Sequence, residues 1–155
     1  ILKGKIKANN KISKFFIKKY YEPDLQLKFI NSLLKLANTS IDISDGLIDD
    51  LKKMINRQSV SFHIFEKNIP ISNTLNQLIE IKKLRKIDIT SRGDDYQILF
   101  TANPIKSRII KRISNNTGIK ITKIGKIISG KNKSMIISIK NKQIEAKNKG
   151  YIHQF

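Results

Sequence analysis

The 155-residue sequence has no cysteine and only two histidines, His63 and His153. Without cysteine the chain has no disulfide, no thiolate nucleophile and no thiolate metal site. Two histidines ninety residues apart do not have the spacing of a histidine-based zinc site. No apolar run approaches the ~20 residues that a membrane-spanning helix needs. The hydrophobic content of 39% instead predicts one packed domain.

Acidic residues are also scarce, because 12 Asp and Glu stand against 31 Lys and Arg and give a formal net charge of +19. Such a charge attracts polyanions without specificity. However, Ile, Lys and Asn together make up 71 of the 155 residues, as AT-rich codons favour, and Lys outnumbers Arg 26 to 5. Nucleic-acid readers rely more on Arg. The charge therefore indicates codon bias, and we expect no specific nucleic-acid partner.

The few acids are clustered. Four of them, Asp42, Asp45, Asp49 and Asp50, fall within nine residues, and no Lys or Arg occurs from residue 36 to residue 51. Carboxylates that are kept together in a cationic protein are typical of a site for a hard cation such as Mg²⁺ with phosphate. The sequence predicts such a site here.

Apolar periodicity predicts alternating strands and helices from residue 39 onward. We expect helices over 10–21, 24–37 with Asp24 as N-cap, from 45 to 55, over 73–86 and from 104 to about 114, and strands over 39–43, 60–65, 96–101, 119–128 and 135–139, with a hairpin arm in 140–149. This order predicts an α/β fold of the α+β variant, with a sheet covered by helices.

The segment 42–47, Asp-Ile-Ser-Asp-Gly-Leu, is then a turn from a strand into a helix. Free backbone N–H groups at the start of the helix favour phosphate, and Asp42 and Asp45 are candidate ligands of a divalent ion. Ser44 can donate to a phosphate oxygen, and Gly46 permits close approach. The alternative is that Ser44 or Asp45 only caps the helix.

Four ordered motifs carry a resemblance to a known family: IDISDGLIDDL (41–51), RGDDYQILF (92–100), ITKIGKII (121–128) and GYIHQF (150–155). With the segment 20–23, they resemble the C-terminal half of thiamine-monophosphate kinases (ThiL-type), which belong to the superfamily of aminoimidazole ribonucleotide synthetase and selenophosphate synthetase. The resemblance implies a layered mixed β-sheet covered by helices. It also implies transfer of the γ-phosphoryl group of ATP to thiamine monophosphate, with Mg²⁺ and without a covalent catalytic residue.

Within each motif, the resemblance implies a role for the residues that match the family pattern. The resemblance implies Mg²⁺ binding by Asp42 and Asp45, ATP binding by Ser44, and substrate binding by Asp94, Tyr151 and, as second choice, Phe155. It further implies that residues 1–155 are a single C-terminal domain, that the family's N-terminal ATP-binding domain is absent, and that the chain is inactive without it. A homodimer of the full-length enzyme and a cytoplasmic location are implied as well, with no membrane partner.

The second motif departs from the family pattern, because Arg92 replaces a Gly, Asp94 a Glu and Gln97 a Glu. Two alternatives therefore stay open: a related ATP-dependent enzyme with another small-molecule acceptor, and a non-catalytic remnant or binding module. We expect Asp49 and Asp50 to be solvated on the polar face of their helix, and Tyr96 to belong to the core.

Overall fold

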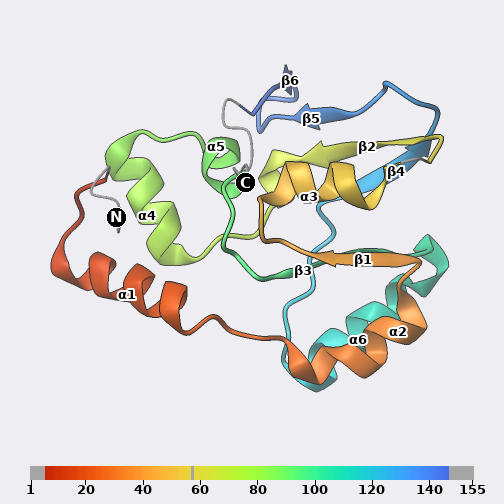
Figure 1. Ribbon diagram of the computed structural model, residues 1–155, viewed down its shortest axis with the longest axis horizontal. Helices are drawn as coiled ribbons and strands as arrows, with labels where there is room; N and C mark the ends of the chain where they lie inside the picture. The colour runs from red at the N-terminus through yellow and green to blue at the C-terminus, as the bar shows by residue number, and fades with distance from the viewer. Residues whose placement is uncertain (1–5, 57, 147–155) are drawn as a thin grey trace, which may run out of the picture.

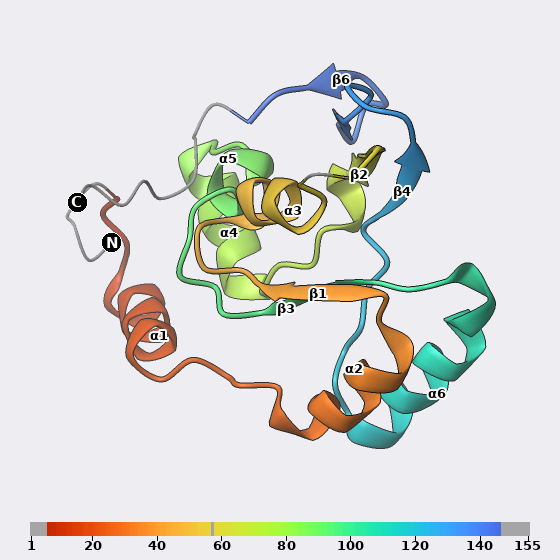
Figure 2. The same cartoon turned by 45° about the vertical axis from the view of Figure 1, so that its right-hand side comes forward.

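The computed structural model describes residues 6–56 and 58–146, and Figures 1 and 2 show their arrangement. The helices are α1 (Asn10–Tyr21), α2 (Ile30–Leu36), α3 (Leu47–Met54), α4 (Asn73–Lys82), α5 (Lys86–Thr90) and α6 (Ser107–Thr117). The strands are β1 (Thr39–Asp42), β2 (Val60–Phe65), β3 (Ile98–Thr101), β4 (Gly125–Ser129), β5 (Met135–Ile137) and β6 (Gln143–Ile144). Three short 3₁₀ helices are η1 (Leu27–Phe29), η2 (Glu66–Asn68) and η3 (Pro104–Lys106).

Helices and strands with a clear apolar periodicity and a clear start or stop residue form as predicted. Helix α1 has the predicted bounds, with the side chain of Asn9 accepting a hydrogen bond from the Ile12 N–H at 2.9 Å as its N-cap. Strand β2 also has the predicted bounds. Helix α6 follows the 3₁₀ turn that opens at Pro104 and ends at Thr117, with left-handed Gly118 as its C-cap, as a proline before and a glycine after a helix indicate.

Several predicted elements differ from the structure, and one of them, the strand predicted over 96–101, begins only at Ile98. Asp24 is not an N-cap, because its carboxylate pairs with Lys19 and the helix begins only after η1. The helix predicted over 73–86 stops at Lys82, since Lys83 is left-handed (φ 50°), and α5 follows as a separate helix. The strand predicted over 119–128 is regular only from Gly125.

The strands fall into two sheets. Strands β1 and β3 form an antiparallel pair in which Asp42 lies opposite Ile98. The other sheet has the order β4-β2-β5-β6, with β2 antiparallel to β4 and parallel to β5. This sheet is mixed and carries helices, so the predicted α/β class is confirmed.

Helix α3 organises the core. Its buried apolar residues, Leu47, Ile48, Leu51 and Met54, belong to one cluster with Phe62, Ile64, Ile69, Ile87, Leu99 and Ile136. Figures 1 and 2 show α3 between the β1–β3 pair and the larger sheet. Full burial of one such side chain stabilises the fold by about 1.5–3 kcal/mol. The core therefore fixes α3, and with it the turn that precedes α3.

Helix α5 lies beside α3 and contributes Ile87 to the core, whereas the other four helices form two pairs. Helix α1 contacts α4, and α2 lies beside α6 in both views (Figures 1 and 2). Lys106 joins the second pair, because its Nζ donates to the carbonyls of Lys35 and Leu36 at 3.0 and 3.1 Å, at the C-terminal end of α2. Within residues 6–56 and 58–146, no helix combines the length and the apolar character needed to cross a bilayer.

Candidate functional site

The predicted strand-to-helix turn exists and joins β1 to α3 through residues 43–46. Helix α3 starts at Leu47, and its N-cap residue is Gly46, which makes no side-chain cap and has φ 121°. Neither Ser44 nor Asp45 therefore caps the helix, so the alternative that they serve only as caps is wrong. Both side chains are half-buried, whereas Asp42 at the end of β1 is exposed.

The turn is held by Asp50 from within the helix. Its Oδ2 accepts hydrogen bonds from the backbone N–H groups of Ser44, Asp45 and Gly46 at 3.0, 2.9 and 3.0 Å. Asp50 is 0% exposed. The prediction that it is a solvated residue on the polar face of α3 is wrong, because the carboxylate folds back over the turn.

This arrangement changes what the turn offers to a ligand. The three N–H groups of residues 44–46 already bind an anion, the carboxylate of Asp50. The prediction that free backbone N–H groups at this turn receive a phosphate is therefore wrong for these three groups. A phosphate at this turn would therefore have to be bound by groups other than the backbone N–H groups of residues 44–46.

Asp45 has a cationic neighbour. Lys53 on α3 pairs with the carboxylate of Asp45 and also donates to Asp50 Oδ1 at 2.9 Å. The hydrogen bond to Asp45, and next that to Asp50, raises the pKa of Lys53 above its usual value. Lys53 thus occupies the position of a counter-ion for both carboxylates.

The described residues do not form a complete metal cage. Across residues 6–56 and 58–146, no three His, Asp or Glu side chains are grouped so as to hold a metal ion. Mg²⁺ often takes only one or two protein carboxylates and completes its shell with water and phosphate oxygens. The donor chemistry of Asp42 and Asp45 therefore fits a share in a Mg²⁺–phosphate site, provided that the ion displaces Lys53 from Asp45.

The second motif lies directly against the turn. The N–H of Asp94 donates to the carbonyl of Ser44 at 2.9 Å, and that of Tyr96 to the carbonyl of Ile43 at 2.8 Å. A Cβ added to Gly93 would lie 2.0 Å from the Ser44 carbonyl oxygen, so only glycine permits this approach. The structure therefore brings Ser44 and Asp94, which are fifty residues apart in sequence, to one place.

Tyr96 does not join the core as predicted. Its backbone is left-handed (φ 51°), its side chain is 41% exposed, and β3 begins only at Ile98. Asp94 is left-handed as well (φ 69°). Non-glycine residues in this conformation are uncommon. The backbone before β3 therefore bends at residues 94–96, and this bend contains Asp94 and Asp95.

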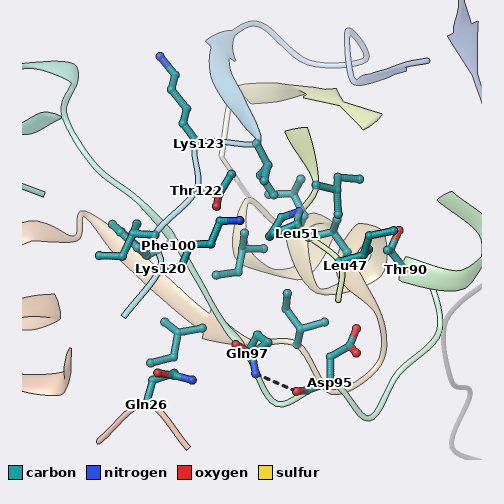
Figure 3. Close-up of a pocket in the computed structure, with 18 of the residues that line it drawn as sticks. Gln26, Leu47, Leu51, Thr90, Asp95, Gln97, Phe100, Lys120, Thr122 and Lys123 are labelled. Carbon is teal, nitrogen blue, oxygen red and sulfur yellow. Dashed lines mark hydrogen bonds between the residues drawn. The ribbon is translucent and has the colours of Figure 1, made fainter. Parts of the chain in front are cut away.

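This bend borders an open, mainly apolar cavity of about 1910 Å³. Figure 3 shows that Gln97 and Asp95 line it from the loop before β3, with Gln97 Nε2 donating to the Asp95 carbonyl at 3.4 Å. The other residues that Figure 3 labels along the cavity are Leu47 and Leu51 of α3, Thr90, Phe100, Gln26, and Lys120, Thr122 and Lys123 before β4. Arg92 and Asp94 also line the cavity.

Asp95 is the titratable group that the surroundings alter most clearly here. Asp95 is exposed at the surface as a residue, but the protein packed around its carboxyl group displaces part of its water. This desolvation, and next the negative charge of Asp94, raise its pKa from the usual 3.8 to about 6. Perturbed carboxyl groups at a cavity are typical of functional sites. Tyr151 and Phe155, the two predicted aromatic contacts, lie outside the described residues.

No protein-family model matches the chain. The curated thiamine-monophosphate kinase of Aquifex aeolicus (strain VF5) is 30% identical over 132 residues, 84% of this chain and 39% of that protein. The one of Buchnera aphidicola subsp. Schizaphis graminum (strain Sg) is 33% identical over 148 residues, 94% of this chain and 44% of that protein. A solved structure, AaThiL complexed with AMPPCP and TMP, aligns over 99% of this chain and 45% of its own, with 25% identity and a TM-score of 0.73.

The chain is a homologue of thiamine-monophosphate kinases. It spans less than half the length of these relatives. Of the residues of this kinase homologue that shape the site, sequence reasoning missed Asp50, Lys53 and Asp95 as functional candidates. One signal was present: Asp50 is four residues after Gly46, so one turn of helix brings it back above the start of α3.

Proposed function

We propose that residues 1–155 form the substrate-side, C-terminal domain of a thiamine-monophosphate kinase, and that the complete enzyme transfers the γ-phosphoryl group of ATP to thiamine monophosphate. Homology to these kinases over most of the chain supports the proposal. The observation that carries it is the backbone hydrogen bond between Ser44 and Asp94, because it joins a predicted nucleotide contact to a predicted substrate contact that lines the cavity.

For phosphoryl transfer, these residues would need to position the reactants and neutralise phosphate charge. The reaction needs no covalent nucleophile. Asp42 and Asp45 would hold Mg²⁺, which when bound neutralises phosphate oxygens. The hydroxyl of Ser44 would donate to a phosphate oxygen of ATP. Asp94, with Tyr151 and Phe155, would contact thiamine monophosphate. The apolar cavity next to Asp94 is large enough for a small ligand with an aromatic ring.

The same homology is our basis for proposing three further properties: an N-terminal ATP-binding domain supplied by the rest of the enzyme, a homodimer of that enzyme, and a cytoplasmic location. The solved relative bound to AMPPCP and TMP supports ATP as co-substrate. The role of Mg²⁺ rests on the acidic turn and on the usual chemistry of phosphoryl transfer.

The test combines binding with turnover. Thiamine monophosphate and ATP·Mg²⁺ are titrated into the chain at physiological salt, with tripolyphosphate as a control, since a chain of net charge +19 attracts any polyanion. The chain is then mixed with the N-terminal half of the Aquifex aeolicus relative, and thiamine diphosphate is quantified. We expect turnover that Asp42→Asn abolishes and Asp49→Asn leaves intact.

One observation favours a second candidate, a non-catalytic remnant of the same superfamily. Lys53 pairs with Asp45, the proposed metal ligand. If neither ligand binds better than tripolyphosphate and the mixture yields no thiamine diphosphate, the non-catalytic alternative is correct. If ADP forms only with another acceptor in place of thiamine monophosphate, Arg92 and Asp94 mark a changed specificity.

A further inference from the structure

Two neighbouring aspartates of α3 have opposite environments. The side chain of Asp49 is 29% exposed and pairs with Lys52 at 3.0 Å, whereas that of Asp50 is 1% exposed and pairs with Lys53 at 2.9 Å. Burial of a carboxylate is costly unless hydrogen bonds and a counter-charge compensate for the lost water. The environment of Asp50 must therefore supply that compensation.

The β1–α3 turn supplies most of it. Three successive N–H groups, those of Ser44, Asp45 and Gly46, converge on one oxygen of Asp50, and Lys53 binds the other. Hydrogen bonds to an ionised acceptor are roughly twice as strong as those between neutral groups. Gly46 has no side chain that could cap α3. The carboxylate of Asp50 instead reaches back to the N–H of Gly46 and of the two residues before it, much as the acidic side chain of a capping box reaches back to the N–H of the N-cap residue.

We propose that Asp50 is a positioning residue: by binding the backbone of residues 44–46 it holds Ser44 and Asp45 in one conformation, and it contacts neither nucleotide nor metal itself. The ligands that the turn would bind, Mg²⁺ and ATP, are part of the proposed function. The part played by Asp50 in the turn rests on the hydrogen bonds alone. Its complete burial keeps it away from any ligand that enters the cavity.

The conformation of the turn is coupled to the second motif. The carbonyl of Ser44 accepts from Asp94, and the carbonyl of Ile43 accepts from Tyr96. A turn that loses its internal anion leaves three N–H groups without this acceptor, and it must rearrange toward water. That movement would change both the direction of Asp45 and the bend at Asp94. Asp50 therefore controls both halves of the candidate site from one buried position.

The first test needs no variant. In isotope-labelled wild-type chain, NMR couplings across the hydrogen bonds are measured from the backbone nitrogens of Ser44, Asp45 and Gly46 to the carboxyl carbon of Asp50. We expect all three couplings, together with slow amide hydrogen exchange. Absence of the couplings overturns the proposal, whether or not the chain has kinase activity.

The second test uses matched variants and Mn²⁺ as probe. Asp49→Ala and Asp50→Ala remove the same charge from adjacent positions, and paramagnetic broadening at residues 42–46 reports the affinity. We expect Asp50→Ala to weaken Mn²⁺ binding by about 10-fold to 100-fold, as loss of a supporting partner does, and Asp50→Asn to restore part of it. Asp49→Ala should bind like wild type.

The outcomes separate the two proposals. If Asp50→Ala and Asp49→Ala lose affinity equally, only charge matters and the positioning role is refuted. If Asp50→Ala does not fold, the wild-type couplings and Asp50→Asn decide. If wild-type chain binds no Mn²⁺ at the turn, the metal part of the proposed function fails, while the three couplings still decide whether Asp50 fixes the turn.

Discussion

Gly93→Ala tests the contact on which the candidate site depends. The added Cβ would lie 2.0 Å from the Ser44 carbonyl oxygen, 3.0 Å from its carbonyl carbon and 3.2 Å from the Asp45 Cα. All three are backbone atoms, so no side chain can swing away. Because ordinary van der Waals contact begins near 3.4 Å, the two loops must separate by about 1.4 Å along the shortest contact.

The cost follows from two contributions. Overpacking of this kind destabilises by about 1–3 kcal/mol, and loss of the Asp94–Ser44 backbone hydrogen bond adds about 1 kcal/mol. We therefore expect the free energy of unfolding to fall by about 2–4 kcal/mol. With a urea m-value of about 2 kcal/mol per M, the midpoint moves down by roughly 1–2 M.

Gly118→Ala is the matched control. Gly118 is left-handed (φ 69°), but nothing lies within 4 Å of an added Cβ, so only backbone strain of about 1 kcal/mol is expected. Urea unfolding followed by circular dichroism measures both variants, and NMR shifts of the Ser44 and Asp45 amides report the turn. If Gly93→Ala costs no more than Gly118→Ala, or leaves those shifts unchanged, the two loops are not in contact.

Three further predictions concern charge and the core. The pKa of Asp95 is raised from 3.8 to about 6. Between these two pH values the folded state binds more protons than the unfolded chain, so the free energy of unfolding falls as pH rises. Asp95→Asn should remove this pH dependence, which urea titrations at pH 4 to 7 measure. Lys53→Met removes a counter-ion and should strengthen Mn²⁺ binding at the turn, whereas Lys52→Met should not; equal affinities would show that Lys53 does not compete with the cation. Ile87→Ala, at a fully buried position, should cost about 2–5 kcal/mol in thermal or urea unfolding, whereas Ile109→Ala, 50% exposed, should cost roughly 0.5 kcal/mol or less.

Local signals in the sequence determine much of the fold. The apolar period and the Asn9 cap define α1, and Pro104 and Gly118 bracket α6 with its 3₁₀ entry. Alternation of apolar and polar residues defines β2. The segment before Gly125 shows the limit of such signals. It alternates like a strand, but for most of its length it has no strand neighbour, and alternation alone does not form a ladder.

The sequence alone placed Asp42, Ser44 and Asp45 at a strand-to-helix turn, since residue types and order suffice to predict a turn. Tertiary structure decided what the turn can bind. A carboxylate is solvated or buried according to where its helix packs, and the core places α3 so that Asp50 meets three backbone donors. Contacts across fifty residues, such as Ser44 with Asp94, depend on chain reversal that no local period encodes.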